Sequence, residues 1–103
     1  MNDFSVIFCT STIEESESIA KALVEEKLAA CVNITDVNSY FIWEGEFLKE
    51  KEALLIVKSK SKNVKKIVER IKELHSYEVP EIIAVPIIAG DEDYLEWVRE
   101  SVR

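Results

Sequence analysis

The sequence has few of the residues that build tight turns, disulfide frameworks or nucleophilic active sites. It holds two glycines, two prolines, two cysteines and one histidine among 103 residues, and it has no glutamine. With so few glycines and prolines, the loops must be few and short. Cys9 and Cys31 form no CxxC pair, which disfavours a disulfide scaffold. Since His75 is the only histidine, a Ser-His-Asp or Cys-His centre has a single available base, and no enzymatic activity is indicated.

The chain also lacks long apolar segments. No apolar run approaches the roughly 20 residues that a helix needs to cross a bilayer, and residues 1–4 show neither the basic nor the apolar part of a signal peptide. We therefore expect a cytoplasmic protein without membrane insertion. The absence of glutamine beside abundant glutamate and lysine is typical of hyperthermophile proteins, and it predicts a thermostable protein.

Acidic residues outnumber basic ones, 20 to 13, which gives a net charge of -7 and a pI near 4.8. A protein that binds nucleic acid needs a basic face to contact phosphates, so this charge argues against nucleic-acid binding. Hydrophobic residues make up 48% of the chain, which is enough for a packed core and excludes a disordered acidic tail. Residues 1–103 are predicted to form a single domain, because the length is typical of one domain and no linker interrupts the sequence.

The first third of the chain predicts a strand followed by a helix. The short apolar run within residues 3–10 indicates a buried strand. Ser11 or Thr12 can begin the helix, because Glu14 and Glu15 follow them at the spacing of a capping box. Apolar residues at helical spacing then indicate an amphipathic helix of about four turns. These are Ile13, Ala20, Leu23, Val24 and Leu28.

The middle of the chain predicts a long β-hairpin. β-branched and aromatic residues dominate residues 31–43 and return in residues 47–59, and Glu44-Gly45 between them suits a tight turn. We expect the first arm to be bent or bulged near residues 36–38. Apolar side chains occupy both faces near the tip, which in a lone domain would favour aggregation, so the hairpin indicates a homo-oligomer. The apolar tip residues are Tyr40, Phe41, Ile42, Trp43 and Phe47.

The last third predicts a helix, a strand and a second helix. Ser61 is positioned to cap the first of these helices, which has the most regular helical pattern of the chain. Residues 82–88 indicate another buried strand, in which Pro86 must lie at an edge or a strand end because proline donates no hydrogen bond. Asp91 follows Gly90 and is expected to cap the final helix. The apolar stripe of the first helix is Val64, Ile67, Val68, Ile71 and Leu74.

The predicted order is strand, helix, strand, strand, helix, strand and a C-terminal helix. This is the order of an α+β, ferredoxin-like split βαβ fold, in which one antiparallel sheet carries two helices on one face. The strands that begin near residues 3 and 82 are expected among the inner strands. The long hairpin and the extra C-terminal helix are additions to the basic fold.

Soft or borderline metal ligands are scarce, and Cys9 and His75 are the only such pair available. A thiolate and an imidazole together suit copper or zinc, and Glu81 can complete such a site. A buried core position is the alternative for the cysteines, and a helix end is the alternative for His75. Residues 75–81 form a short polar segment with an extended backbone before Pro80, so the segment is either a pocket wall or an ordinary connector.

Several short motifs stand in a characteristic order along the chain. They are Leu28-Ala29-Ala30-Cys31-Val32-Asn33-Ile34, Ser39 to Gly45, Lys58-Ser59, His75 to Ile82 and Tyr94-Leu95-Glu96-Trp97. Together they resemble the CutA divalent-cation tolerance family over essentially the whole chain. The resemblance implies a ferredoxin-like subunit in a tight homotrimer, similar in architecture to the nitrogen-regulatory PII proteins. It also implies a link to tolerance of divalent metals, copper above all, with no obligatory cofactor.

Carried over by position, the resemblance assigns candidate roles to individual residues. It implies that Cys9, His75 and Glu81 are the candidate copper ligands. Ser76 stands where the family usually has proline, and Phe41 stands where it usually has tyrosine. The first departure predicts a less rigid connector, and the second removes a hydroxyl from the implied cleft. That cleft, between subunits, is implied at Trp43, Glu52, Lys58, Tyr77 and Trp97.

Two functions remain as alternatives. The first is a cytoplasmic, non-enzymatic homotrimer that binds divalent metal ions, copper above all. The second is a signalling or scaffold trimer that binds a small effector or a protein partner in the cleft between subunits, as the PII-like architecture suggests by analogy of fold.

Overall fold

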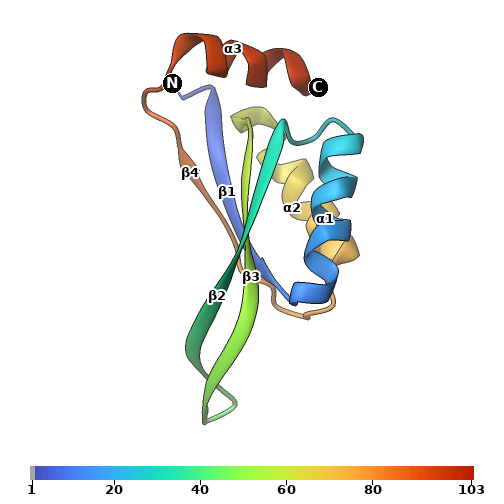
Figure 1. Cartoon of the computed structure of the whole chain (residues 1–103), viewed down its shortest axis with the longest axis vertical. Coiled ribbons are helices and arrows are strands. Elements are labelled where there is room, and N and C mark those ends of the chain that lie inside the picture. The colour runs from blue at the N-terminus through green and yellow to red at the C-terminus, as the bar shows by residue number, and fades with distance from the viewer. Residues whose placement is uncertain (1) are drawn as a thin grey trace.

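A computed structural model describes residues 2–103 of the chain, and its elements follow the predicted order (Figure 1). A four-stranded sheet carries α1 and α2 on one face, while α3 lies across one end of the sheet. This arrangement confirms the predicted α+β architecture. The elements are β1 (Phe4–Ser11), α1 (Ile13–Glu25), β2 (Cys31–Trp43), β3 (Glu46–Lys60), the 3₁₀ helix η1 (Ser61–Asn63), α2 (Val64–Leu74), β4 (Ile82–Pro86) and α3 (Glu92–Ser101).

The sheet is antiparallel with the strand order β2-β3-β1-β4. The inner strands are therefore β1 and β3, so the expectation that the strand beginning near residue 82 is an inner, buried strand is wrong. β4 is an edge strand, and the Ile83 side chain is 55% exposed. Pro86 ends this edge strand, as its missing N–H requires. The sequence could not show this edge position, because an apolar run is equally typical of an inner strand.

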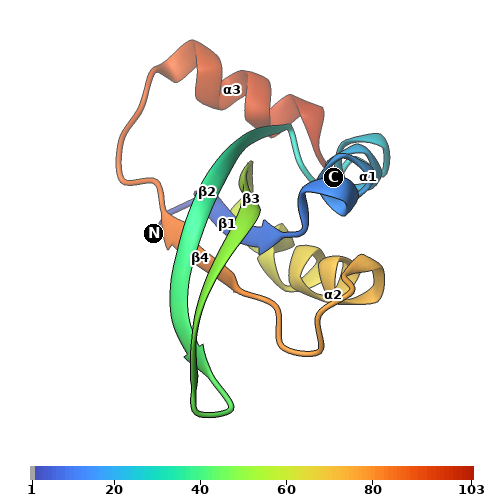
Figure 2. The ribbon, with the colours of Figure 1, turned by 60° about the horizontal axis from the view of Figure 1, so that its bottom comes forward.

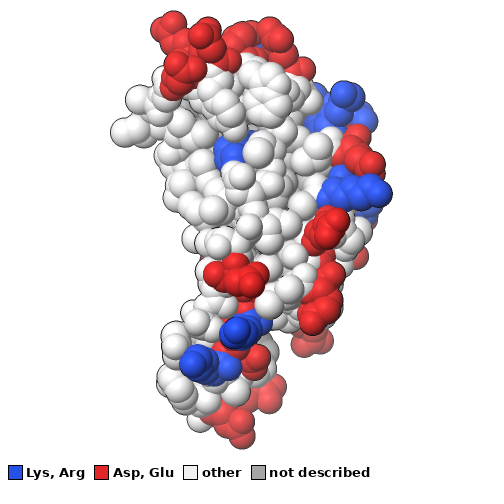
Figure 3. Space-filling view, viewed as in Figure 1, with Lys and Arg blue, Asp and Glu red and all other residues white. Residues whose placement is uncertain are grey.

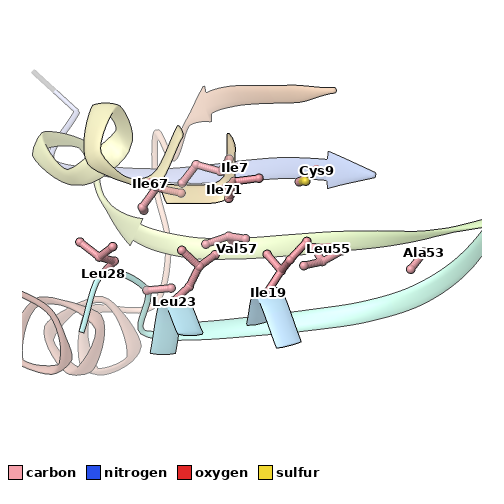
Figure 4. Packing of buried hydrophobic residues seen from close by; sticks show 11 residues of the cluster. Ile7, Cys9, Ile19, Leu23, Leu28, Ala53, Leu55, Val57, Ile67 and Ile71 are labelled. Carbon is pink, nitrogen blue, oxygen red and sulfur yellow. The ribbon is translucent and has the colours of Figure 1, made fainter. Parts of the chain in front are cut away.

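The main core lies between the sheet and the two helices (Figures 2 and 4). Ile19 and Leu23 of α1, together with Ile67 and Ile71 of α2, pack on residues of β1 and β3 such as Ile7. The predicted stripe of α2 is confirmed at its centre. In α1 the predicted stripe is partly wrong. Ile13 and Val24 are exposed, and Leu28 follows the helix, because the buried side of α1 is centred on Ser16, Ile19 and Leu23.

Side-chain caps set the N-terminal ends of α1 and α3, but not of α2. Thr12 begins α1 with a full capping box, in which Thr12 Oγ1 accepts the Glu15 N–H at 3.2 Å and Glu15 Oε2 accepts the Thr12 N–H at 3.2 Å. Asp91 caps α3, as predicted, by accepting the Tyr94 N–H at 2.9 Å. Ser61 does not cap α2, because its hydroxyl bonds Ser5 Oγ at 2.7 Å and η1 precedes the helix.

The hairpin is longer than the rest of the sheet, and its outer part projects beyond the helices (Figure 1). Its register runs without interruption from Cys31 opposite Lys58 to Trp43 opposite Glu46. The predicted bulge near residues 36–38 is therefore wrong, and the arms bend through continuous twist. The turn is as predicted: Glu44 and Gly45 both take positive φ, 51° and 80°, as in a two-residue hairpin loop.

The face of the sheet opposite α1 and α2 is covered by a helix only at one end, where Val98 of α3 and Val102 just after it pack on Phe4. Figure 3 shows a broad area with few charged residues in this view, with acidic residues above it and both charge signs on the hairpin below. Apolar residues of the hairpin are strongly exposed, Ile42 and Phe47 each to 71%. Among the described residues, no helix is long and apolar enough to cross a membrane.

Candidate functional site

A cleft of about 680 Å³ extends along the hairpin from Glu52 toward Trp43 near the tip. Cross-strand pairing places Ser39 opposite Glu50 and Phe41 opposite Leu48, so these four side chains follow one another along the hairpin wall. The opposite wall comes from the connector between α2 and β4. The lining combines aromatic rings with carboxylates: Thr10, Ser39, Tyr40, Phe41, Trp43, Leu48, Glu50, Glu52, Tyr77, Glu78, Val79 and Glu81.

Glu52 is the most buried carboxylate of the cleft, with only 5% of the residue exposed. Its Oε2 accepts the Tyr77 hydroxyl at 2.8 Å. Burial, the hydrogen bond to Glu52 and the negative charge around it all raise the pKa of Tyr77 far above its ordinary value. Tyr77 therefore stays protonated and remains a donor to Glu52. This pair joins the two walls of the cleft.

His75 fixes the start of the connector. Its Nε2 lies 2.7 Å from the Thr10 carbonyl oxygen, and its Nδ1 accepts the Tyr77 N–H at 3.1 Å. Because a backbone N–H only donates, Nε2 carries the hydrogen and donates to Thr10. Both ring nitrogens are therefore engaged, and His75 serves here to hold the connector on β1. The His75 and Tyr77 rings also contact each other, with centroids 4.7 Å apart.

Cys9 lies behind the cleft in the main core, with none of the residue exposed. Its thiol donates to the Thr10 carbonyl oxygen at 3.5 Å. Burial, followed by the charges of Glu81, Glu15 and Glu52, raises the pKa of the Cys9 thiol to about 12. The thiol is therefore protonated at neutral pH, whereas a copper ligand must be a thiolate.

The structure places some of the residues proposed from the sequence at the cleft and others away from it. Trp43, Glu52, Tyr77 and Glu81 line the cleft. Lys58 lies toward the other end of β3, where it bonds Asn33 and the Ile56 carbonyl oxygen. Trp97 lies on α3 beside Tyr94, at a centroid distance of 5.6 Å. Within residues 2–103 of one chain, no three His, Cys, Asp or Glu side chains form a group that could hold a metal ion.

Other lining residues were not identified from the sequence. Glu50 and Glu78 add two carboxylates, and Thr10 and Tyr40 add polar and aromatic surface. The spacing of Glu50 and Glu52 carried a usable signal, because residues two apart on a strand share a face. Glu78 had no such signal, since its place depends on how the connector folds back against the hairpin.

The fold and the cleft define the class of protein: a small α+β domain of the ferredoxin-like split βαβ type, with an acidic, aromatic cleft along its hairpin. A family model described as CutA1 divalent ion tolerance protein matches residues 4–101. The chain belongs to the CutA1 divalent ion tolerance family. This confirms the resemblance drawn from the sequence motifs.

Some relatives match over nearly their full length. The divalent-cation tolerance protein CutA of Thermus thermophilus is 47% identical over 97 residues, which are 93% of this chain and 94% of that protein. A solved structure of CutA from Archaeoglobus fulgidus, described as periplasmic, has a TM-score of 0.94 at 42% identity and covers 97% of this chain and 99% of its own. For CutA1 from Oryza sativa the TM-score is 0.95 at 38% identity, with 99% and 95% covered. The ferredoxin-like fold is thereby confirmed.

Proposed function

We propose that the protein binds divalent cations, copper among them, in the acidic cleft and thereby contributes to divalent-cation tolerance. The main support for this proposal is the number of carboxylates that line the cleft. Four carboxylates contribute to its described lining, which includes no lysine or arginine: Glu50, Glu52, Glu78 and Glu81. Carboxylate oxygens are ligands of divalent cations, and a concave surface of one sign of charge concentrates the opposite ion. The name of the family agrees with this function.

Glu52 and Glu81 are the ligands that we favour. Tyr77 donates to Oε2 of Glu52, so we assign Oε1 to the cation. Glu81 is exposed on the connector wall of the cleft. Because one chain groups no three suitable side chains among its described residues, we propose that a neighbouring copy closes the cleft and completes the ligand set.

The set of Cys9, His75 and Glu81 is the competing proposal for the copper site. It requires the Cys9 thiol, with a pKa of about 12, to lose its proton. It also requires His75 to give up a hydrogen bond to Thr10 or Tyr77. Both costs oppose this set in the conformation described, whereas the carboxylate set needs neither change.

Calorimetric titration with Cu²⁺ distinguishes the two ligand sets. We expect Glu52→Gln and Glu81→Gln each to weaken binding at least tenfold, while Cys9→Ala and His75→Ala change it less than threefold. Glu17→Gln, which removes an exposed carboxylate from α1, is the matched control. Loss of binding in Cys9→Ala with full binding in Glu52→Gln would assign the site to the competing set.

We further propose that the working unit is a cytoplasmic homotrimer. The exposed apolar side chains of the edge strand β4 and of the hairpin tip support an assembly of copies. In such an assembly, Lys58 and Trp97 reach a cleft only if a neighbouring copy supplies them. Cell fractionation tests the location, because some relatives are described as periplasmic or chloroplastic.

Binding of a small effector in the same cleft is the second candidate function. Its volume of about 680 Å³ lies within the range of small-molecule sites, roughly 300–1,000 Å³, and it far exceeds what one ion needs. Aromatic walls above carboxylates would suit an organic cation. A small molecule that copurifies with the metal-free protein, and that Trp43→Ala releases, would favour this function over metal binding.

A further inference from the structure

Glu15 does more than cap its own helix. Its Oε2 accepts the Thr12 N–H at 3.2 Å and the Thr12 hydroxyl at 2.8 Å, which completes the capping box of α1. The same carboxylate reaches the connector between α2 and β4. Oε2 accepts the Ser76 hydroxyl at 2.7 Å, and Oε1 accepts the Ser76 N–H at 2.9 Å. One side chain therefore ties the start of α1 to the first residue after His75.

Ser76 stands at the head of a short chain of contacts that ends in the cleft. The next residue, Tyr77, donates its N–H to His75 Nδ1 at 3.1 Å and its hydroxyl to Glu52 at 2.8 Å. The connector then continues through Glu78 and Val79 to Glu81, and all three line the cleft. The position of this wall thus depends on contacts at its first two residues.

An ionised carboxylate is the chemical group that these contacts need. Four hydrogen bonds from donors converge on its two oxygens. Burial opposes ionisation of Glu15, but the hydrogen bonds from Ser76 and Thr12 outweigh it and hold the pKa of Glu15 below its ordinary value. A proline in place of Ser76 would have neither the N–H nor the hydroxyl that Glu15 binds.

We propose that Glu15 and Ser76 are positioning residues for the cleft, which hold the connector wall so that Tyr77, Glu52 and Glu81 face a bound cation. The effect on cation binding rests on the function proposed above. The effect on the connector itself does not, because it follows from the hydrogen bonds alone. In this chain, two hydrogen bonds to a carboxylate fix the connector at Ser76.

The test uses two variants and two measurements on the full chain. Glu15→Gln keeps a side chain that can complete the capping box, but it replaces one acceptor oxygen by an NH₂ group. Ser76→Ala removes the hydroxyl and leaves the N–H. Ser18→Ala is the matched control, because this exposed serine of α1 bonds only the Glu15 carbonyl oxygen of its own helix. Hydrogen exchange at the Tyr77 amide and Cu²⁺ affinity are measured for each protein.

We expect Glu15→Gln and Ser76→Ala each to speed exchange at the Tyr77 amide by about tenfold, which corresponds to one charge-assisted hydrogen bond. We expect both variants to bind Cu²⁺ severalfold more weakly than the unaltered protein. Because the two residues act through one contact, the Cu²⁺ affinity of the double variant should be no lower than that of the more strongly affected single variant. Unchanged exchange at Tyr77 in both variants, or equal changes in Ser18→Ala, would overturn the proposal. If the unaltered protein binds no Cu²⁺, the proposed function fails, and exchange at Tyr77 still decides the positioning role.

Discussion

At the scale of single residues, the cleft depends on groups that hold their protons. Tyr77 remains a phenol because burial and Glu52 raise its pKa, and Cys9 remains a thiol because burial and three glutamates raise its pKa to about 12. Both groups lie near glutamate side chains, and Glu52 is near both of them. The cleft therefore offers carboxylate oxygens as ligands, whereas the Cys9 sulfur remains a protonated thiol.

Replacement of Tyr77 by phenylalanine should destabilise the protein by about 1 kcal/mol, because buried Glu52 loses its donor. It should also change the response to alkali. The unfolded chain releases the Tyr77 proton near pH 10, whereas the folded chain retains it, so stability falls as the pH rises above about 10. Urea unfolding at pH 7 and pH 10.5 measures both effects. Tyr40→Phe is the control, and an equal pH response in the two variants would contradict the assignment.

The two cysteines should differ strongly in their reactivity. Cys9 is fully buried with a raised pKa, whereas Cys31 is partly exposed. At pH 8 we expect iodoacetamide to label Cys31 of the native protein at least tenfold faster than Cys9, and unfolding to remove the difference. Mass spectrometry of the digested protein reads the two sites separately. Equal labelling of both in the native protein would show that Cys9 is accessible as a ligand.

At the scale of elements, the hairpin and the connector make the two walls of the cleft. The hairpin wall is held by uninterrupted pairing and by its tight turn. The connector wall has little regular structure and relies on side-chain bonds from His75, Ser76 and Tyr77. We therefore expect the hairpin wall to be less sensitive to single substitutions than the connector wall.

The turn offers a direct test of this view of the hairpin. A Cβ at Gly45 would meet no atom within 4 Å, but φ is 80° there, so Gly45→Ala carries only a backbone cost. We expect a loss of about 1 kcal/mol, while Glu44→Asn gains a few tenths because asparagine tolerates the positive φ of 51°. Thermal unfolding measures both variants. A stabilised Gly45→Ala protein would contradict the turn geometry.

Local signals in the sequence predicted most elements. Thr12, Glu44-Gly45 and Asp91 were readable because capping and tight turns need particular side chains within four residues. The edge position of β4 was not readable, because an apolar run is equally typical of an inner strand. The family resemblance, and not a local signal, named Trp43, Glu52 and Tyr77, which line a cleft of one chain, and the implied cleft between subunits stays a prediction. The engagement of both His75 nitrogens could not be predicted, because Thr10 is distant in sequence.

At the scale of the whole molecule, the chain leaves much apolar surface uncovered. Exposed apolar side chains lie on the hairpin tip and on β4, among them Ile42, Phe47, Ile83 and Val85. The main core uses only the face of the sheet that carries α1 and α2. A second and third copy would extend the core beyond one chain, and the thermostability expected from the sequence would then belong to the assembly.

The assembly should have about three times the 11.8 kDa mass of one chain. Light scattering at micromolar concentration measures this mass. Ile83→Lys places a charge on the exposed edge strand and should dissociate the assembly, whereas Val24→Lys, on the outer side of α1, should not. A monomeric mass for the unaltered protein would contradict the trimer. A trimeric mass for Ile83→Lys would show that β4 is not part of the interface.

The central claim is that carboxylates of the cleft hold the cation, and the spectrum of bound copper tests it most directly. Electron paramagnetic resonance of the protein loaded with one Cu²⁺ per chain reports the atoms that bind the metal. We predict a spectrum of Cu²⁺ bound by oxygen atoms, without coupling to nitrogen. This spectrum of bound copper should be lost in Glu52→Gln and in Glu81→Gln. A spectrum with histidine nitrogen coupling, or a thiolate-to-copper absorption band that disappears in Cys9→Ala, would contradict the account.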